Sequence, residues 1–313
     1  MKVTLIATVL DAADHVGAFL AGIAAQTRPP DEVVIVDGGS TDGTLEILRA
    51  DPEITVLVEQ GANIARGRNL AFAAATHDVI AVADADCGYG PTWLAELLRP
   101  LEAGADVSMG WTEPVIGSFL EACTTGHIPL DASEVDPATF MPSARSVAFR
   151  RDALEAIGGY PEWLPIGEDM WVNHRWRERR LDMRFAPDAV AAWHPRSTLD
   201  ATWRQYFRYA RGDGQAGMYP ERHAIRVGTY VGLALALTSR RTWPKALVMA
   251  GAVVYAGPQV RRARARLRSP SSRAVAVAAV PAVMASIDAA KIAGYAAGLA
   301  DRVRRRPGRQ SRS

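Results

Sequence analysis

Short, continuous apolar runs alternate with helical stretches through the first part of the chain. Runs of this kind are typical of strands buried on both faces, so they predict an α/β fold with a mostly parallel sheet covered by helices on both sides. The predicted strands are Val3–Leu10, Glu32–Val36, Thr55–Val58 and Val79–Ala83. Ligands of such sheets bind at the carboxyl ends of the strands. Polar clusters at residues 37–42 and 84–86 follow two of these strands and are expected at that edge.

The intervening and following segments predict helices and two further strands. Helices are expected at His15–Gln26, Thr41–Arg49, Asn63–Ala75, Arg151–Ile157 and Asp169–Arg180. Strands are expected at Ser146–Phe149 and Ala189–Trp193. Asn63 is a suitable N-cap, since its side chain can accept a backbone N–H of the first helical turn.

The composition changes from Val227 onward, where Ala, Val, Gly and Leu dominate. Charged residues interrupt every apolar segment before it reaches about 18 uncharged residues, the usual length of a membrane span. Residues 223–301 are therefore predicted to be helical and membrane-associated, lying at the interface or entering it as hairpins. A soluble helical subdomain is the alternative. Residues 302–313 predict a basic, disordered tail.

The remaining residues, 1–222, form the predicted catalytic domain. Arginines gather near the C-terminal end although the formal net charge is only +2, which favours contact with an anionic surface. The N-terminal sequence is typical of a strand, and we expect no signal peptide there. The 2 cysteines show no metal or disulfide spacing, so a reducing compartment is expected. Together these features favour the cytoplasmic side of the cell membrane.

Two carboxylates, Asp84 and Asp86, stand directly after the strand that ends near Ala83. At a turn they can converge on one hard cation, and Mg²⁺ or Mn²⁺ bound by one or two carboxylates plus diphosphate oxygens is a usual arrangement. A solvated acidic turn is the alternative for this tripeptide taken alone. His194, which also follows a strand, is a further candidate metal ligand.

Three other positions carry candidate chemistry. Asp37 ends a strand and can accept hydrogen bonds from a base or ribose, while Gly39 lets a ligand approach the backbone closely. Glu168 and Asp169 open a helix, where the helix dipole alone also explains acidic residues. The functional interpretation of Asp169 is a general base that takes a proton from a sugar hydroxyl. Arg66 and Arg68, near Asn69, are candidate phosphate ligands, with a solvated basic face as the alternative.

In combination, these residues resemble the inverting family 2 glycosyltransferases of the GT-A fold. The likeness runs from about Val3 to about Gly214 and includes Gly158–Glu162 and Gly167–Asp169. It implies that Asp169 is the catalytic base, that Asp86, with Asp84 and His194, binds the metal, and that a nucleotide-diphosphate sugar is the donor. By the same resemblance, the donor-binding residues are Asp11, Asp37, Gly39, Asp42, Arg66, Asn69, Asp84, Asp86 and Glu168.

The chain departs from that family in two places. Thr8, Leu10 and Asp11 stand where Pro, an aromatic residue and Asn are common, so the nucleotide contact there is open. A Gln-x-x-Arg-Trp motif, typical of processive synthases, is absent, which favours a single addition. The expected activity is a hexosyltransferase in cell-envelope polysaccharide biosynthesis, with a lipid-linked or glycan acceptor.

Two other classes remain open at this point. A sugar-nucleotide pyrophosphorylase would need a basic, glycine-rich loop near the N-terminus, but residues 8–15 are acidic and lack glycine. A non-catalytic, membrane-bound sugar-nucleotide binder would keep Asp37 and Asp86 without transferring sugar. Nucleic-acid binding is disfavoured because the basic stretches lack interleaved aromatic residues.

Overall fold

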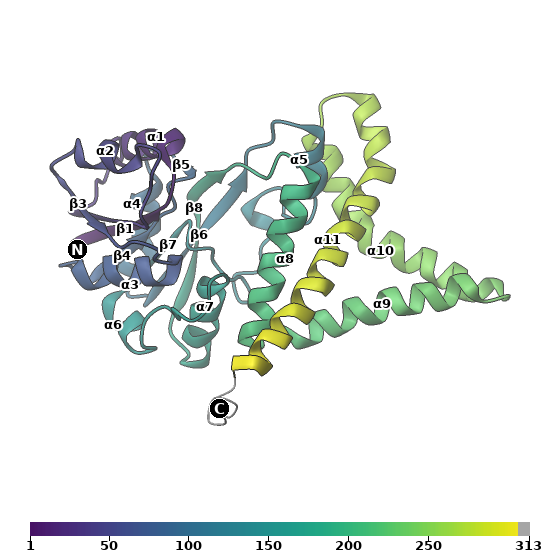
Figure 1. Cartoon of the computed structure of the whole chain (residues 1–313). Helices are drawn as coiled ribbons and strands as arrows, with labels where there is room; N and C mark the ends of the chain where they lie inside the picture. Colours follow the sequence, from purple (N-terminus) through teal and green to yellow (C-terminus); the bar gives the residue numbers. More distant parts are fainter. Residues whose placement is uncertain (306–313) are drawn as a thin grey trace, which may run out of the picture. The chain divides into compact units, whose positions relative to one another are not determined.

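The structure, a computed structural model, describes residues 1–305 (Figure 1). The described chain divides into two compact units. The sheet unit comprises Met1–Val115 and Asp131–His194, and the helical unit comprises Ile116–Leu130 and the residues from Pro195 onward. The catalytic domain predicted to end at residue 222 remains a prediction, and α8 (Leu199–Ala216) lies in the helical unit.

The sheet unit contains one sheet with the strand order β3-β2-β1-β4-β7-β6-β8-β5. Parallel pairs join β1 to β2 and β4, β2 to β3, and β6 to β8, whereas β7 runs antiparallel between β4 and β6, and β5 antiparallel to β8. The prediction of a mostly parallel α/β sheet is confirmed. The strands are β1 (Val3–Val9), β2 (Glu32–Asp37), β3 (Ile54–Val58), β4 (Val79–Val82), β5 (Cys87–Tyr89), β6 (Val107–Pro114), β7 (Val147–Arg150) and β8 (Met183–Trp193).

Helices cover both faces of this sheet because successive strand residues point to opposite sides. In β1, Leu5 joins a core with Phe19 and Trp93, while its neighbour Ile6 joins a second core with Trp176. The helices are α1 (Ala13–Ala24), α2 (Thr44–Arg49), α3 (Ile64–Ala74), α4 (Trp93–Glu102), α6 (Arg151–Glu155) and α7 (Glu168–Glu178), with a 3₁₀ turn at Ala132–Glu134.

Three details of α2 and α3 determine how these helices lie beside the strand ends. The predicted cap of α3 is confirmed, since the Asn63 side chain accepts the Arg66 N–H at 2.9 Å. Gly67 lets α3 lie close to β1, because a Cβ there would come within 2.7 Å of the Thr8 side chain. The predicted start of α2 at Thr41 is wrong: α2 begins at Thr44, since residues 40–43 form a loop tied to the end of β1.

The helical unit consists of long helices with few loops. They are α5 (Phe119–Thr124), α8, α9 (Pro220–Thr238), α10 (Thr242–Arg266) and α11 (Pro270–Arg305). Helix α11 runs through residues 302–305, so the predicted disordered tail is wrong for those four residues, and its remainder, 306–313, lies outside the described residues. Among the helices that the structure describes, α11 alone is long and apolar enough to cross a membrane, a test that core helices also pass.

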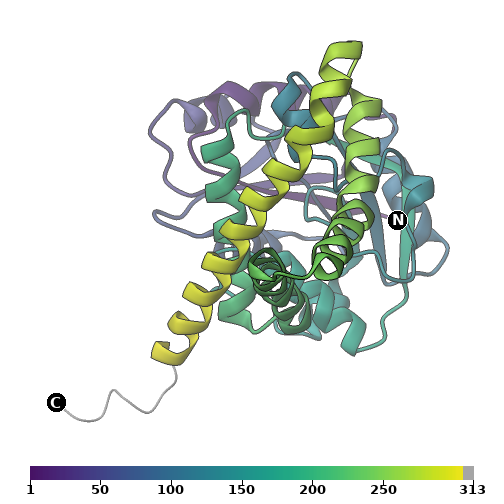
Figure 2. The same cartoon turned by 90° about the vertical axis from the view of Figure 1, so that its right-hand side faces the viewer.

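Helices α8 and α11 pack at very short range (Figure 2). A Cβ on Gly298 would lie 2.1 Å from the Arg211 carbonyl oxygen, and one on Gly294 would lie 2.2 Å from that of Phe207. A Cβ on Gly214 would meet the Tyr295 carbonyl oxygen at 2.5 Å. Since all three obstacles are helix backbone, only glycine permits this packing.

We expect Gly298→Ala to reduce the free energy of unfolding by about 1–3 kcal/mol, because the added methyl forces the two helices apart. Gly232→Ala in α9 is the control: no atom lies within 4 Å of its Cβ position, and the better helix propensity of alanine contributes up to about 1 kcal/mol. Urea unfolding followed by circular dichroism measures both. Equal stabilities would contradict the packing.

Candidate active site

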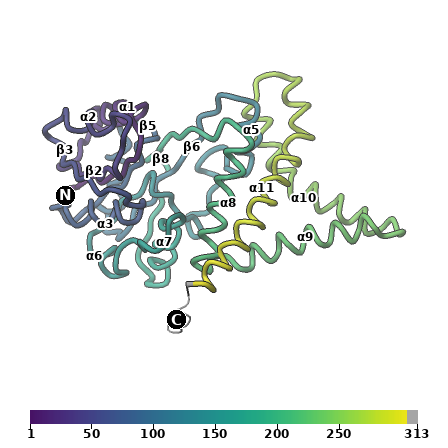
Figure 3. Tube along the Cα trace, in the orientation of Figure 1, coloured from purple at the N-terminus to yellow at the C-terminus, as the bar shows by residue number. Residues whose placement is uncertain are grey.

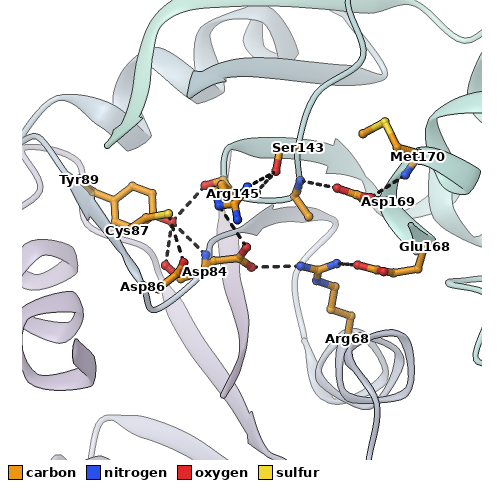
Figure 4. Close-up of polar contacts among 11 residues, drawn as sticks. Arg68, Asp84, Asp86, Cys87, Tyr89, Ser143, Arg145, Glu168, Asp169 and Met170 are labelled. Atoms are coloured by element: carbon orange, nitrogen blue, oxygen red, sulfur yellow. Dashed lines mark hydrogen bonds and ion pairs between the residues drawn. The ribbon is translucent and has the colours of Figure 1, made fainter. Parts of the chain in front are cut away.

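A buried arginine joins the two acidic clusters that the sequence singles out. Arg68, on α3, is 3% exposed and donates from Nη1 to Glu168 Oε1 at 2.5 Å and from Nη2 to Asp84 Oδ1 at 3.0 Å (Figure 4). Burial lowers the pKa of its guanidinium, but Glu168 and Asp84 outweigh burial and hold that pKa above its ordinary value. The end of β4 and the start of α7 therefore meet at one place.

Glu168 is itself buried at the N-terminus of α7. Burial raises the pKa of its carboxyl group, and the neighbouring Asp169 raises it further, while Arg68 opposes both. Its ion pair with Arg68 is therefore internal to the protein. The predicted contact of Glu168 with the donor remains a prediction.

Asp169 is more accessible than Glu168. Its Oδ1 accepts the N–H of Met170 at 2.8 Å, and its Oδ2 accepts that of Ala144 at 3.4 Å (Figure 4). The next residue, Arg145, places Nε 3.9 Å from Asp84 Oδ2 and its guanidinium over the Trp193 ring. The segment at 144–145 is thus a second connection between Asp169 and Asp84.

The turn after β4 separates Asp84 from Asp86. The buried Tyr89 hydroxyl accepts the Asp84 N–H at 2.9 Å and lies 3.0 Å from the Arg145 carbonyl oxygen, which holds the turn in place. Asp84 faces Arg68 and Arg145, whereas Asp86 is exposed and, among the described residues, receives only a weak hydrogen bond from the Cys87 thiol at 3.4 Å. Of the two, Asp86 has oxygens available to a cation.

His194 follows β8 and is exposed. Trp193 is the register partner of Cys87 at the end of the β5–β8 pairing, and His194 and Asp86 are the residues next to this pair. Within residues 1–305, no group of three His, Cys, Asp or Glu side chains is arranged to hold a metal ion. A divalent cation here would need further oxygen ligands from its substrate, as Mg²⁺ commonly does.

Asp37 lies at the end of β2 and is fully buried. Its Oδ1 accepts the N–H groups of Gly39 and Ser40, both at 2.8 Å, while its buried Oδ2 has no hydrogen-bond partner among the described residues. Such orphaned oxygens are rare in folded proteins. Gly39 has φ +100°, and a Cβ there would collide with the Gln60 side chain, so this tight turn requires glycine.

Asp11 and Asp42 fasten the β1 loop to the β2 loop. Asp11 accepts the Thr41 N–H at 2.9 Å, and Asp42 accepts the Thr44 hydroxyl at 2.5 Å and the Ala13 N–H at 3.0 Å. The Thr44 hydroxyl and then the Ala13 N–H lower the pKa of Asp42. These contacts shape the strand-end edge, and the predicted donor contacts of both residues remain predictions.

Arg66 and Asn69 bind the turn at 158–162. Asn69 donates to the Tyr160 carbonyl at 2.9 Å and accepts the Tyr160 N–H at 2.8 Å, so its amide is fully used. Arg66 pairs with Glu59 and, at 3.4 Å, with Glu162; its hydrogen bond to Glu59 is the main cause of a raised pKa. Any donor contact of Arg66 would have to compete with these carboxylates.

From the sequence, Arg68 is predicted only as a candidate phosphate ligand, and its role as a buried bridge between Asp84 and Glu168 is missed. A signal for it exists, because Ala65, Arg68 and Ala71 are spaced by three and share the buried face of α3. An arginine in an otherwise small, apolar stripe predicts a buried ion pair. Arg145 and Tyr89 carry no such signal, since their contacts depend on how distant segments meet.

The strand-end acidic residues, the buried guanidinium and the α7 carboxylates all lie in the sheet unit. Residues 4–158, which include most of that unit, match the family model described as "Glycosyl transferase family 2". The chain belongs to this family. The family and the glycosyltransferases among its relatives identify it as a transferase, which disfavours both the pyrophosphorylase and the non-catalytic binder.

Curated relatives agree with this assignment, and a solved structure shares the fold. The glycosyltransferase AglE of Haloferax volcanii is 28% identical over 236 residues, covering 69% of this chain and 74% of AglE. The succinoglycan biosynthesis protein ExoA of Rhizobium meliloti is 27% identical, covering 65% of this chain and 66% of ExoA. The mannosyltransferase PcManGT of Pyrobaculum calidifontis, solved with GDP-Man and Mn²⁺, shares the fold with a TM-score of 0.59 and 20% identity, covering 96% of this chain and 87% of that chain.

We expect Arg68→Met to lower the free energy of unfolding by about 3–5 kcal/mol, because it leaves Glu168 buried without its partner. The matched control is Arg99→Met, which removes an exposed guanidinium from its ion pair with the half-buried Glu96 and should cost about 0–1 kcal/mol. Chemical denaturation of both variants tests this. If Arg68→Met and Arg99→Met are equally stable, the buried bridge does not hold the site together.

Proposed function

We propose that this family 2 glycosyltransferase is an inverting, metal-dependent enzyme that adds a single sugar from a nucleotide-diphosphate sugar to a lipid-linked or glycan acceptor. The Arg68 bridge carries the proposal, since it brings the strand-end carboxylates into one site with Glu168 and Asp169. A site with a cation-binding side and a proton-accepting side fits sugar transfer from a diphosphate.

The residues present suit a bound Mg²⁺ or Mn²⁺ ion. Asp86 offers exposed carboxylate oxygens, the hard ligands that these ions prefer, and His194 directly follows Trp193, the register partner of Cys87. Asp84, held by two arginines, acts by orienting the turn that presents Asp86. When bound, the ion would neutralise charge on the diphosphate leaving group. PcManGT, solved with Mn²⁺ and GDP-Man, supports this choice.

Asp169 is the proposed base because its carboxylate is accessible, whereas Glu168 is buried and paired with Arg68. Asp169 takes the proton from the acceptor hydroxyl as that oxygen forms its bond to the anomeric carbon. The bond from the anomeric carbon to the diphosphate oxygen breaks, and the nucleoside diphosphate departs with the electron pair. Attack opposite the leaving group inverts the anomeric centre.

The nucleoside would lie at the ends of β1 and β2. The unpartnered Oδ2 of Asp37 supports an acceptor role toward a base or ribose, and the loop braced by Asp11 and Asp42 would shape that end of the site. Gly39 would allow close approach to the backbone. Arg66 and Asn69 would contribute by holding the turn at 158–162 beside the donor.

The acceptor and location follow from the relatives and the C-terminal half. ExoA is named for succinoglycan biosynthesis, which supports a role in assembling cell-envelope polysaccharide. The apolar helical unit supports a membrane-proximal acceptor, and we place the enzyme on the cytoplasmic side of the membrane. The missing processive motif supports addition of one sugar per acceptor.

Asp169→Asn should lower the turnover number about 10²–10⁴-fold, because the amide cannot take the proton. Donor affinity should stay within about twofold, since the carboxylate acts on the acceptor. Steady-state transfer assays give the first value, and calorimetric titration with the nucleotide sugar gives the second. Normal turnover would remove Asp169 from its proposed role.

Asp86→Ala should weaken Mn²⁺-dependent binding of a nucleoside diphosphate by roughly tenfold or more, judged from the cost of disturbing metal sites. The probes are GDP and UDP, each titrated with Mn²⁺ and with a chelator, and Asp188→Ala, which removes an exposed carboxylate from β8, is the control. Binding that is equally strong in chelator, or unchanged in Asp86→Ala, would contradict a metal at this turn.

A further inference from the structure

Helices α9 and α10 form a hairpin with almost no core of its own. Only His223 and Ala236 are buried in α9, and only Ala256 and Ala263 in α10. Large apolar side chains are exposed along both helices, up to 77% for Val254. They are Ile225, Val227, Val231, Leu235, Leu237, Trp243, Leu247, Met249, Val253, Val254 and Tyr255.

The tip of this hairpin projects away from the packed pair of α8 and α11, whereas the C-terminal end of α10 returns to α11 and packs against it (Figures 1 and 3). A helix that is apolar around its whole circumference is stable when protein or lipid covers it, not when water does. Soluble monomers rarely expose a continuous apolar surface of this kind. The hairpin therefore requires an apolar covering.

Its charge indicates what that covering is. Between Glu221 and Asp288 the sequence contains no acidic residue. The turn of the hairpin carries three exposed cations, Arg240, Arg241 and Lys245, on either side of the exposed Trp243. Cations beside apolar and aromatic side chains match an anionic lipid surface, whereas a second copy would bring the same positive tip.

The hairpin is too short and too charged at its tip to span a bilayer. The uncharged stretches Val227–Ser239 and Ala246–Val260 rise about 20 and 22 Å, at 1.5 Å per residue, against a hydrocarbon core of about 30 Å. Insertion tip-first would also carry three cations toward the bilayer centre, which is strongly unfavourable. An orientation along the interface satisfies both constraints.

Helix α11, the longer apolar helix, packs within the protein instead. Its Asp288 is 3% exposed and accepts hydrogen bonds from Arg226 at 2.7 Å and from Tyr230 and Tyr255 at 3.1 Å each. Together with the close glycine packing against α8, these bonds give α11 a structural role.

We propose that the α9–α10 hairpin lies in the headgroup region of an anionic bilayer, while α11 remains inside the protein as its support. The proposal deepens the membrane-proximal part of the proposed function and rests on that part alone. The proposal is tested by vesicle binding in the absence of any sugar donor. A chain that does not bind vesicles would therefore not contradict sugar transfer, and a chain that does not bind the donor would not contradict the membrane proposal.

The first experiment compares full-length chains on phosphatidylcholine vesicles with and without about a third phosphatidylglycerol. We expect flotation with anionic vesicles, and loss of at least roughly tenfold in affinity for the double variant Leu235→Glu, Leu247→Glu. Val303→Glu, at a 65% exposed position near the end of α11, is the control and should bind normally. Equal binding of the double variant and the control, or equal binding to neutral vesicles, overturns the proposal.

The tip is tested separately with Arg240→Gln, Arg241→Gln. We expect affinity for anionic vesicles to fall by about thirtyfold, which follows from the usual contribution of two cations near such a surface. No change would show that the tip does not face the lipid.

Two further measurements, made on the wild type and on one conservative variant, do not depend on the folding of the charge-changing variants. Brominated acyl chains should quench fluorescence of the wild type, and Trp243→Phe should lose most of that quenching. Alkaline carbonate should release the chain from vesicles. Quenching that survives in Trp243→Phe overturns the proposal, and so does resistance to carbonate, which a membrane-spanning α11 would give. A dimer that forms without lipid and that Leu235→Glu, Leu247→Glu dissociates also overturns it.

Discussion

The buried guanidinium of Arg68 is the interaction on which the site depends. Asp84 and Glu168 come from segments far apart in the sequence, and each would repel the other in a region that excludes water. Arg68 makes their approach favourable, at 3.0 and 2.5 Å, and it is carried into this position by a helix that Gly67 allows to lie against β1. Glu168 thereby becomes part of the buried framework, and Asp84, whose side chain is 26% exposed, is held against it by Arg68.

That framework divides the acidic residues into two groups with different uses. In the first group, carboxylate oxygens accept hydrogen bonds from arginines, hydroxyls and backbone N–H groups of the protein. This group comprises Asp84, Glu168, Asp11 and Asp42. Asp86, near Asp84 in the sequence, is exposed, and Asp169, next to Glu168, is half-buried and, within residues 1–305, accepts only backbone N–H groups. The ion pairs of Asp84 and Glu168 with Arg68 hold the turn after β4 and the start of α7 in place. They thereby fix the directions of the neighbouring Asp86 and Asp169 side chains. A cation and a reacting hydroxyl would then meet carboxylates that are already oriented, which is the kind of preorganisation that lowers reaction barriers.

The parallel half of the sheet and its caps could be predicted from local patterns. Continuous apolar runs identify β1 to β4, and Asn63 identifies the start of α3, because each signal lies within a few residues. The antiparallel insertion of β7 between β4 and β6 depends on pairing between distant segments, which local patterns do not encode. The site residues also differ in how far the sequence predicts them. Asp86 and Asp169 lie at recognisable strand and helix ends, whereas the roles of Arg68 and Arg145 depend on contacts between distant segments of the folded chain. Helix α2 begins later than expected because Asp11 engages the residues preceding it.

The central claim is that the carboxylates after β4 and at the start of α7 open onto one site. A crystal structure of the enzyme with Mn²⁺ and a nucleotide-diphosphate sugar, with the metal located by anomalous scattering, tests this most directly. We predict a manganese peak at the Asp86 carboxylate, the diphosphate beside it, and the anomeric carbon facing Asp169. A donor bound on another surface, or an Asp169 carboxylate directed away from the sugar, would contradict the account.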